Sequence, residues 1–177
     1  FSSAELVFYR SLFGLLTIAL IVKIRGMSIA TPHWKAHLWR GLSGFAALML
    51  FFYAITRLPL ATAVTLNYTA PLFLAFLSVL VLKERPRLPL LLAILLGFVG
   101  VVLLLRPSLH QEQLVAGLMG LASGFLAAIA YLNVKQLGQM GEPSLRIVFY
   151  FTLICTIGGG IWMVIHAFHP VSPRNFL

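Results

Sequence analysis

The chain has 177 residues, of which 60% are hydrophobic and only 10% are charged, and its mean hydropathy is +0.99. Soluble domains carry about 25% charged residues, so this composition excludes an ordinary water-soluble fold. The formal net charge is +9, but the basic residues are spread between apolar runs and form no single face or arm, which excludes a nucleic-acid-binding protein. The one cysteine, Cys155, lies inside an apolar run, so no disulfide can form within the chain.

Six apolar runs follow one another, and short groups of Lys, Arg, Gly and Pro separate them. Each run is about 20 residues long, which is the length an α-helix needs to cross a hydrocarbon core about 30 Å thick. The predicted spans are 4–22, 32–56, 61–82, 88–105, 114–134 and 143–167. Transmembrane β-strands are excluded, because they have about 10 residues of alternating polarity. The sequence therefore predicts an all-α fold, a polytopic transmembrane helix bundle with six spans.

The basic residues fall unequally on the two sides that six alternating spans define. One side receives Lys23, Arg25, Lys35, Arg40, Lys83, Arg85, Arg87, Lys135 and Arg146. The other side receives Arg57, Arg106 and Arg174, while Arg10 lies within the first span. The positive-inside rule places the more basic side in the cytoplasm. The first span therefore runs from outside to inside, and a preceding helix absent from this sequence would explain such a start.

Glycine patterns mark the fifth and sixth spans. Gly120 and Gly124 are spaced i, i+4, which predicts a close approach of two helix backbones. Gly158, Gly159 and Gly160 follow one another in the sixth span, where they weaken the helix and predict either a hinge or a tight helix crossing.

Four sequence patterns occur in order along the chain. They are FYRSLFG at 8–14; ATA at 61–63 with APLF at 70–73 and LKER at 82–85; LGFVGVVLL at 96–104; and GLMG at 117–120 with AAIAY at 127–131. In these patterns and their spacing, the chain resembles an EamA-type member of the drug/metabolite transporter superfamily over essentially its whole length.

The resemblance implies a ten-helix protein built as two five-helix repeats of opposite orientation. This chain would hold helices two to seven, with residues 1–107 as the remainder of the first repeat and 108–177 as the start of the second. Inverted repeats hold substrate near the bilayer midplane between the halves and alternate its access. The implied function is a multi-pass transporter of small metabolites or drug-like compounds in the cell inner (plasma) membrane, with export the commoner direction in the family.

Arg10 is the first candidate substrate-binding residue, because it lies inside a predicted span. A charge at the centre of a membrane helix costs about 2.5–3.5 kcal/mol on insertion scales. One interpretation is that Arg10 anchors an anionic or zwitterionic substrate or forms an ion pair that controls access. The other is that its side chain extends toward the outer headgroups.

Asn67, Tyr68, Thr69 and Pro71 form a polar group in the middle of the third span. Pro71 removes a backbone donor, and a membrane tolerates this only where neighbours or a cavity satisfy the freed carbonyl. These four residues are therefore candidates for a substrate cavity; the alternative is that Asn67 and Thr69 hydrogen-bond one helix to another. Tyr131 is the last candidate, although a tyrosine near a span end is commonly an interfacial anchor.

No catalytic, metal or cofactor site is predicted. The acidic residues all lie at span ends, and the histidines lie in loops or at ends, so no catalytic arrangement can be assembled from them. We expect a protein that is not an enzyme, whose partners are a small-molecule substrate and the lipid bilayer. The alternative function is a non-transporting bundle that acts as an assembly or regulatory subunit. Because no acid lies mid-span, proton coupling would need a residue outside these spans.

Overall fold

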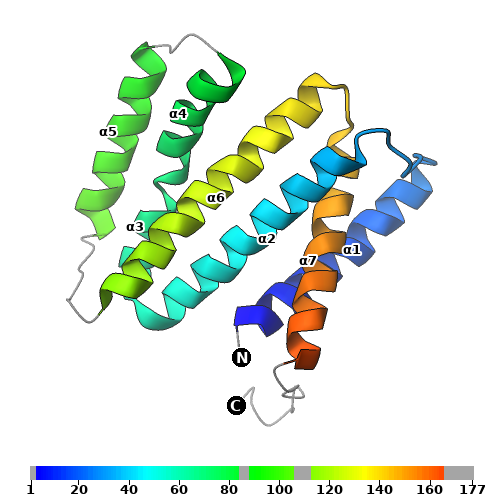
Figure 1. The fold of residues 1–177 in the computed structure, drawn as a ribbon, viewed down its shortest axis with the longest axis horizontal. Helices are drawn as coiled ribbons and strands as arrows, with labels where there is room; N and C mark the ends of the chain where they lie inside the picture. The colour runs from blue at the N-terminus through cyan, green and yellow to red at the C-terminus, as the bar shows by residue number, and fades with distance from the viewer. Residues whose placement is uncertain (1–2, 84–87, 106–112, 166–177) are drawn as a thin grey trace.

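The computed structural model describes residues 3–83, 88–105 and 113–165, and within these ranges the chain is almost entirely helical (Figure 1). The helices are α1 (Ser3–Ile24), α2 (Trp34–Arg57), α3 (Leu60–Asn67), α4 (Ala70–Leu82), α5 (Leu88–Leu105), α6 (Leu114–Gln139) and α7 (Ser144–Ile165). This described part contains no strand, which confirms the predicted all-α fold.

Five segments of the described residues are long and apolar enough to cross a membrane. Four of them lie in α1, α2, α6 and α7, and the fifth joins α3 and α4 over Leu60–Leu82. A shorter apolar helix, Leu88–Gly100, lies within α5. These segments occur at the six predicted places, which confirms the polytopic helical bundle.

The helices pack side by side in an order that differs from their order along the chain (Figure 1). α2 and α6 run together through the middle of the bundle. α7 contacts both α1 and α2 on one flank, while α3 and α4 contact α6 on the other. Helices far apart in the sequence therefore meet in the centre, and the first and last helices lie together on one flank.

The surface and the interior of the bundle differ in side-chain size. Large apolar residues point outward, as in Phe13 (78% exposed), Leu96 (72%) and Val164 (83%). Buried positions are largely small, and Ala54, Ala63 and Ala128 are fully buried. Small residues let helix backbones approach closely in a bilayer, where burial from water does not drive their association. This distribution fits a bundle surrounded by lipid.

The third predicted span is divided into α3 and α4 at Tyr68 and Thr69. The Thr69 hydroxyl donates a hydrogen bond to the Leu66 carbonyl at 2.6 Å, so it satisfies a carbonyl at the end of α3. Pro71 lies in the first turn of α4, where a helix needs no backbone donor. The Pro-containing group thus makes a break between two helices, a larger interruption than a kink.

The glycines of α6 lie against this break. A Cβ at Gly124 would be 2.7 Å from the Thr69 hydroxyl and 3.0 Å from the Leu66 carbonyl oxygen. A Cβ at Gly120 would be 3.0 Å from the Leu66 side chain. The predicted close approach at Gly120 and Gly124 is therefore present, and the backbone approached is that of the α3–α4 break.

The three consecutive glycines of α7 lie in an unbroken helix. A Cβ at Gly159 would be 3.2 Å from the backbone nitrogen of Phe8 in α1, and one at Gly158 would be 2.9 Å from the Phe45 ring in α2. These glycines form a tight helix crossing, which was one of the two predicted alternatives.

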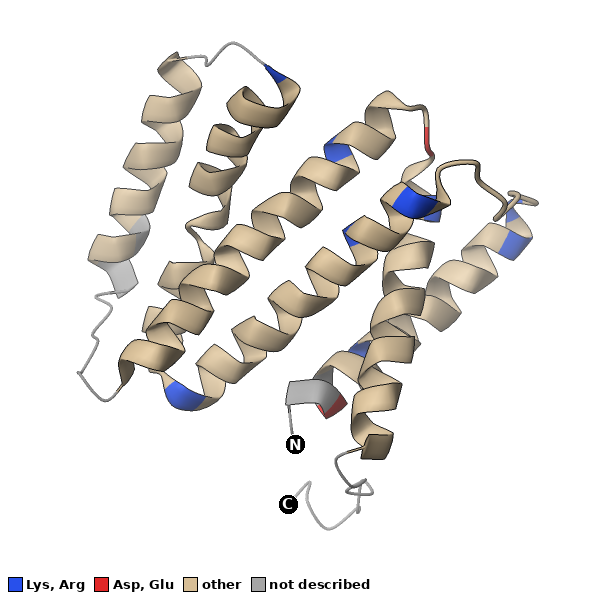
Figure 2. Cartoon of the chain, in the orientation of Figure 1, with Lys and Arg blue, Asp and Glu red and all other residues tan. Residues whose placement is uncertain are grey.

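The basic segments gather at one end of the bundle, where α1 ends and α2 begins (Figure 2). The α1–α2 and α6–α7 connections lie at this end, as does the last residue of α4 (Figure 1). Arg40, which the charge count placed with this basic end, lies six residues inside α2. Arg85, Arg87, Arg106 and Arg174 lie outside the described residues.

Candidate functional site

A half-open cavity of about 250 Å³ lies between the helices and is lined by residues of α1, α2, α3, α6 and α7. Most of its wall consists of small or apolar side chains from α2 and α6. The polar residues on the wall are Arg10, Arg40, Asn67 and Tyr131. The described lining contains two cations and no carboxylate, so the cavity is electropositive.

Arg40 enters the cavity from α2, about 9 Å along the helix from Trp34 at 1.5 Å per residue. Its guanidinium carbon lies 4.1 Å from the centre of the Phe151 ring of α7, a distance at which a cation and a ring attract each other. Its Nε and Nη1 atoms are buried and have no hydrogen-bond partner in the described chain. Contact with the ring stabilises the charge but leaves these donors unused.

Gly41 and Gly44 bring α2 and α7 close together beside Arg40. A Cβ at Gly41 would be 2.1 Å from the Ile154 side chain, and one at Gly44 would be 2.4 Å from Nη1 of Arg40. Gly41 therefore leaves space for Ile154, and Gly44 leaves the space that the Arg40 side chain occupies. Arginine followed by small residues at helical spacing was the sequence signal for this site, and it was missed because Arg40 was counted with the basic end.

Arg10 reaches the same cavity from α1. The residue remains exposed where the described helices do not cover it. Arg10 and Arg40 are both near enough to Cys155 of α7 to interact with its side chain electrostatically. Arg10 and Arg40 therefore border the same cavity, although 30 residues separate them in sequence.

Asn67 and Tyr131 complete the polar part of the wall. The Asn67 amide donates a hydrogen bond to the Ser123 hydroxyl of α6 at 3.3 Å, and this hydroxyl donates to the Gly120 carbonyl at 2.6 Å. Asn67 therefore both joins two helices and borders the cavity. Tyr131 is 53% exposed.

The structure brings together three of the predicted site residues, Arg10, Asn67 and Tyr131. Tyr68, Thr69 and Pro71 are not part of the cavity lining. Thr69 is buried against Gly124, while Tyr68 and Pro71 are exposed. These three residues lie beside the site and form the break that ends α3 at Asn67.

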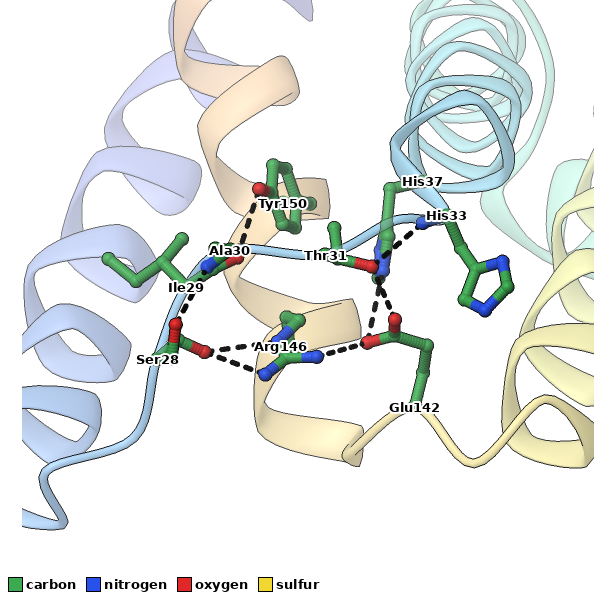
Figure 3. A network of polar contacts seen from close by, with 9 residues as sticks. All are labelled: Ser28, Ile29, Ala30, Thr31, His33, His37, Glu142, Arg146 and Tyr150. Atoms are coloured by element: carbon green, nitrogen blue, oxygen red, sulfur yellow. Dashed lines mark hydrogen bonds and ion pairs between the residues drawn. The ribbon is translucent and has the colours of Figure 1, made fainter.

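A second polar cluster lies at the basic end of the bundle (Figure 3). We call it the Glu142 network, and it consists of Thr31, His37, Glu142 and Arg146. The Glu142 side chain is 3% exposed and accepts a hydrogen bond from Nη1 of Arg146 at 2.8 Å. It also accepts a hydrogen bond from the Thr31 hydroxyl, and Nε2 of His37 lies 3.5 Å away.

Backbone contacts extend this network to the α1–α2 connection. Nε and Nη2 of Arg146 donate to the Ser28 carbonyl at 3.1 and 2.8 Å. The Tyr150 hydroxyl donates to the Ile29 carbonyl at 3.1 Å, and its ring centre is 4.6 Å from that of His37. The network therefore ties the beginning of α2 to the beginning of α7.

Glu142 remains a carboxylate in this setting. Burial alone would raise its pKa, but the hydrogen bonds from Thr31 and Arg146 outweigh burial and hold the pKa of Glu142 below its ordinary value.

The described residues contain no group of three or more His, Cys, Asp or Glu side chains close enough to hold a metal ion.

Apolar helices of membrane-spanning length, packed side by side, define a polytopic membrane protein. The sequence profile of the EamA-like transporter family matches residues 1–106. The chain belongs to the EamA-like transporter family, which confirms the resemblance to the drug/metabolite transporters.

Relatives that are named for their substrates are membrane transporters as well. The chain is 32% identical over 155 residues to the pseudopaline exporter of Pseudomonas aeruginosa, a match that covers 88% of this chain and 54% of the exporter. It is 26% identical over 159 residues to the S-adenosylmethionine uptake transporter of Rickettsia conorii, covering 88% of this chain and 52% of the relative. The chain thus spans about half the length of the curated relatives it matches.

A solved crystal structure has the same fold. It superposes with a TM-score of 0.83 over 98% of this chain and 61% of its own, at 19% sequence identity. The arrangement of the helices described above is therefore one that an experimentally determined protein adopts.

Proposed function

We propose that this chain is the part of a transporter that forms one wall of its substrate site, and that the whole protein moves small metabolites across the bacterial plasma membrane by alternating access. The observation that carries the proposal is the cavity on which Arg10, Asn67 and Tyr131 meet. Polar side chains inside a membrane bundle are costly, and they commonly mark a substrate pathway.

The position of the cavity between two groups of helices supports this function. α1, α2 and α3 lie in the proposed first repeat (1–107), and α6 and α7 lie in the proposed second repeat (108–177). The family match over residues 1–106 agrees with this division. Inverted-repeat transporters bind substrate between their repeats and expose it to either side by movement of one repeat against the other.

We propose that Arg10, Asn67 and Tyr131 contact the substrate, and that Tyr68, Thr69 and Pro71 shape the site from behind. The α3–α4 break ends the helix at Asn67, so it directs that amide toward α6 and the cavity. Irregular backbone at membrane depth is tolerated where it is buried in protein or lines a cavity. The polar group of the third span would thus act through the position of Asn67.

We propose export as the direction of transport. The name of the Pseudomonas relative supports it, whereas the Rickettsia relative is named for uptake at lower identity. Vesicles that have substrate on only one side of the membrane would show in which direction the protein moves it.

Transport by the full-length protein in liposomes tests the proposal against a non-transporting subunit. Labelled amino acids, organic acids and S-adenosylmethionine would be loaded inside, and their release would be compared with that from protein-free vesicles. We expect at least one class of metabolite to leave faster with protein present, and Asn67→Ala to slow it. A protein that inserts and folds but moves none of these solutes in either direction would favour the subunit alternative.

A further inference from the structure

We infer that the cavity binds an organic anion, and that Arg10 and Arg40 together hold its carboxylate or phosphate group. This inference rests on the proposed function and adds to it the chemical class of the substrate. It also adds Arg40, which the sequence analysis assigned to the basic end of the membrane helices.

The described lining of the cavity has an excess of positive charge. Two guanidinium groups border one space of about 250 Å³, and the described part of its wall provides no acid. Glu142 is bonded to Arg146 and Thr31 in a separate network and does not line the cavity. Two like charges in one cavity repel each other, so an anion between them is strongly favoured.

Two hydrogen-bond donors of Arg40 are available to a ligand. Nε and Nη1 are buried without a partner, although buried polar groups in proteins are nearly always hydrogen-bonded. Packing on the Phe151 ring holds the guanidinium plane in place at 4.1 Å. A planar, fixed fork with free N–H groups matches the two oxygens of a carboxylate or phosphate.

The rest of the wall limits the size and shape of the ligand. Pockets for drug-sized ligands are about 300–1,000 Å³, so the space formed by this chain fits a smaller molecule or one end of a larger one. Phe51, Phe151 and Tyr131 provide aromatic surface beside the two arginines. An acid with a short apolar or aromatic body would contact both the aromatic side chains and the two arginines.

The test measures binding by the purified full-length protein in nonionic detergent. Mono- and dicarboxylic acids and phosphate esters would each be compared with the matching amide or alcohol, for example phenylacetate with phenylacetamide. The readout is the shift in melting temperature as a function of ligand concentration. We expect acids to stabilise the protein and their neutral analogues to have no effect.

Substitutions assign the effect to the two arginines. Arg40→Gln and Arg10→Gln should each weaken acid binding about 10- to 100-fold, the equivalent of losing one or two charge-assisted hydrogen bonds. Arg40→Lys should give an intermediate loss, because it keeps the charge and loses the fork. Arg57→Gln is the matched control, because this arginine of the same helix contacts Tyr53 and does not line the cavity. The exposed Arg10 provides a second variant if Arg40→Gln does not fold.

Three outcomes would overturn the inference. Acids that stabilise no better than their neutral analogues, or equally in Arg40→Gln and wild type, would show that the arginines do not bind an anion. Stabilisation by phosphatidylglycerol micelles without any effect of soluble acids would assign the site to a lipid headgroup. Transport of neutral or cationic solutes that survives Arg40→Gln would overturn the anion assignment and leave the proposed function intact. Anion binding without transport would support the anion assignment and contradict the proposed function.

Discussion

Gly44 determines where the Arg40 guanidinium group can lie. A Cβ at this position would be 2.4 Å from Nη1 of Arg40 and 2.7 Å from the Phe151 ring. We expect Gly44→Ala to displace Arg40 from the ring and narrow the cavity, lowering substrate affinity about tenfold or more. Stability should change less, because the end of an arginine side chain can move. Substrate affinity in detergent and flux in liposomes would measure the two effects.

Gly138→Ala is the matched control for Gly44→Ala. Gly138 also lies in a helix, α6, and a Cβ there would have no heavy atom within 4 Å. Alanine is the better helix former, so this substitution should leave transport unchanged and stabilise the protein by up to about 1 kcal/mol. Equal effects of the two substitutions would show that Gly44 has no special relation to the cavity.

Arg10 gives a separate prediction about function and insertion. Arg10→Ala removes a charge from a membrane helix, so insertion and folding should be retained. Transport should fall sharply if the side chain contacts substrate, by about tenfold or more from lost charge-assisted hydrogen bonds. Flux and membrane-inserted protein would be measured on the same vesicles, with Arg57→Ala as control. Unchanged flux would mean that Arg10 extends to the headgroups instead.

The polar residues of the site were predictable to different degrees. Arg10 could be found because a charge several residues inside a long apolar run is conspicuous. Arg40 was missed, because it lies in the first two turns of its helix close to Lys35 and was counted with the basic residues of that end. Tyr68 and Thr69 are adjacent to Asn67 in sequence but do not line the cavity, because neighbouring residues of a helical segment face different directions.

The α3–α4 break depends on its contact with α6. Gly124 faces the Thr69 hydroxyl and the Leu66 carbonyl, so Gly124→Ala would force α6 away from the break. Overpacking of this kind costs about 1–3 kcal/mol. We expect a lower melting temperature and weaker transport, because Asn67 at the end of α3 would lose its hydrogen bond to Ser123.

Gly97→Ala is the control for this packing prediction. Gly97 lies in α5, where a Cβ would have no heavy atom within 4 Å. Its substitution should leave the melting temperature unchanged or slightly raised. If Gly124→Ala behaved in the same way, the break would not depend on close contact with α6.

The Glu142 network makes the stability of this end of the bundle dependent on pH. Because the pKa of Glu142 is lowered in the folded protein, its carboxylate favours folding. Its contribution is complete above the ordinary glutamate pKa of about 4.3 and is lost as pH falls through the lower folded value. Thr31, His37 and Arg146 face the carboxylate.

Glu142→Gln should remove this dependence. At neutral pH we expect a loss of about 1–3 kcal/mol, because the Arg146 and Thr31 hydrogen bonds to a charged acceptor are weakened. The difference from wild type should stay constant from about pH 7 down to the ordinary glutamate pKa of about 4.3 and shrink as the pH falls further, toward the lowered pKa of the folded wild-type Glu142. Melting temperatures of both proteins in detergent over this range would measure it. A difference that did not shrink at low pH would contradict the role assigned to the carboxylate.

The helices could be predicted from sequence far better than their packing. Apolar runs of about 20 residues specify spans directly, since the bilayer requires that length. The pairing of α2 with α6 and of α1 with α7 was not predictable, because all these helices present similar apolar surfaces. The glycines indicated that close contacts exist, but only the structure shows that Gly124 meets the α3–α4 break and Gly159 meets Phe8.

The orientation of the whole molecule follows from its charge distribution. Moving Arg40 from the basic end into α2 leaves that end still the more basic of the two, so the positive-inside argument is unchanged. The α1–α2 and α6–α7 connections should therefore face the cytoplasm, and the α2–α3 connection should face outside.

Single cysteines at opposite ends of the bundle would measure this orientation. Met140, next to the α6–α7 turn, is 53% exposed, and Leu60, at the beginning of α3, is 62% exposed. On a Cys155→Ser background, which removes the only cysteine of this sequence, Leu60→Cys should react with a membrane-impermeant maleimide added to intact cells. Met140→Cys should react only after the membrane is opened.

The pair of cysteines also tests the bundle itself, because an odd number of crossings must separate the two positions. Between Leu60 and Met140 the chain crosses through α3 and α4, returns through α5, and crosses again through α6. If α5, whose described apolar part is shorter than the other spans, did not cross the membrane, both positions would react from the same side. Reaction of both cysteines in intact cells would therefore contradict a spanning α5, and with it the division of the bundle into two repeats of opposite orientation.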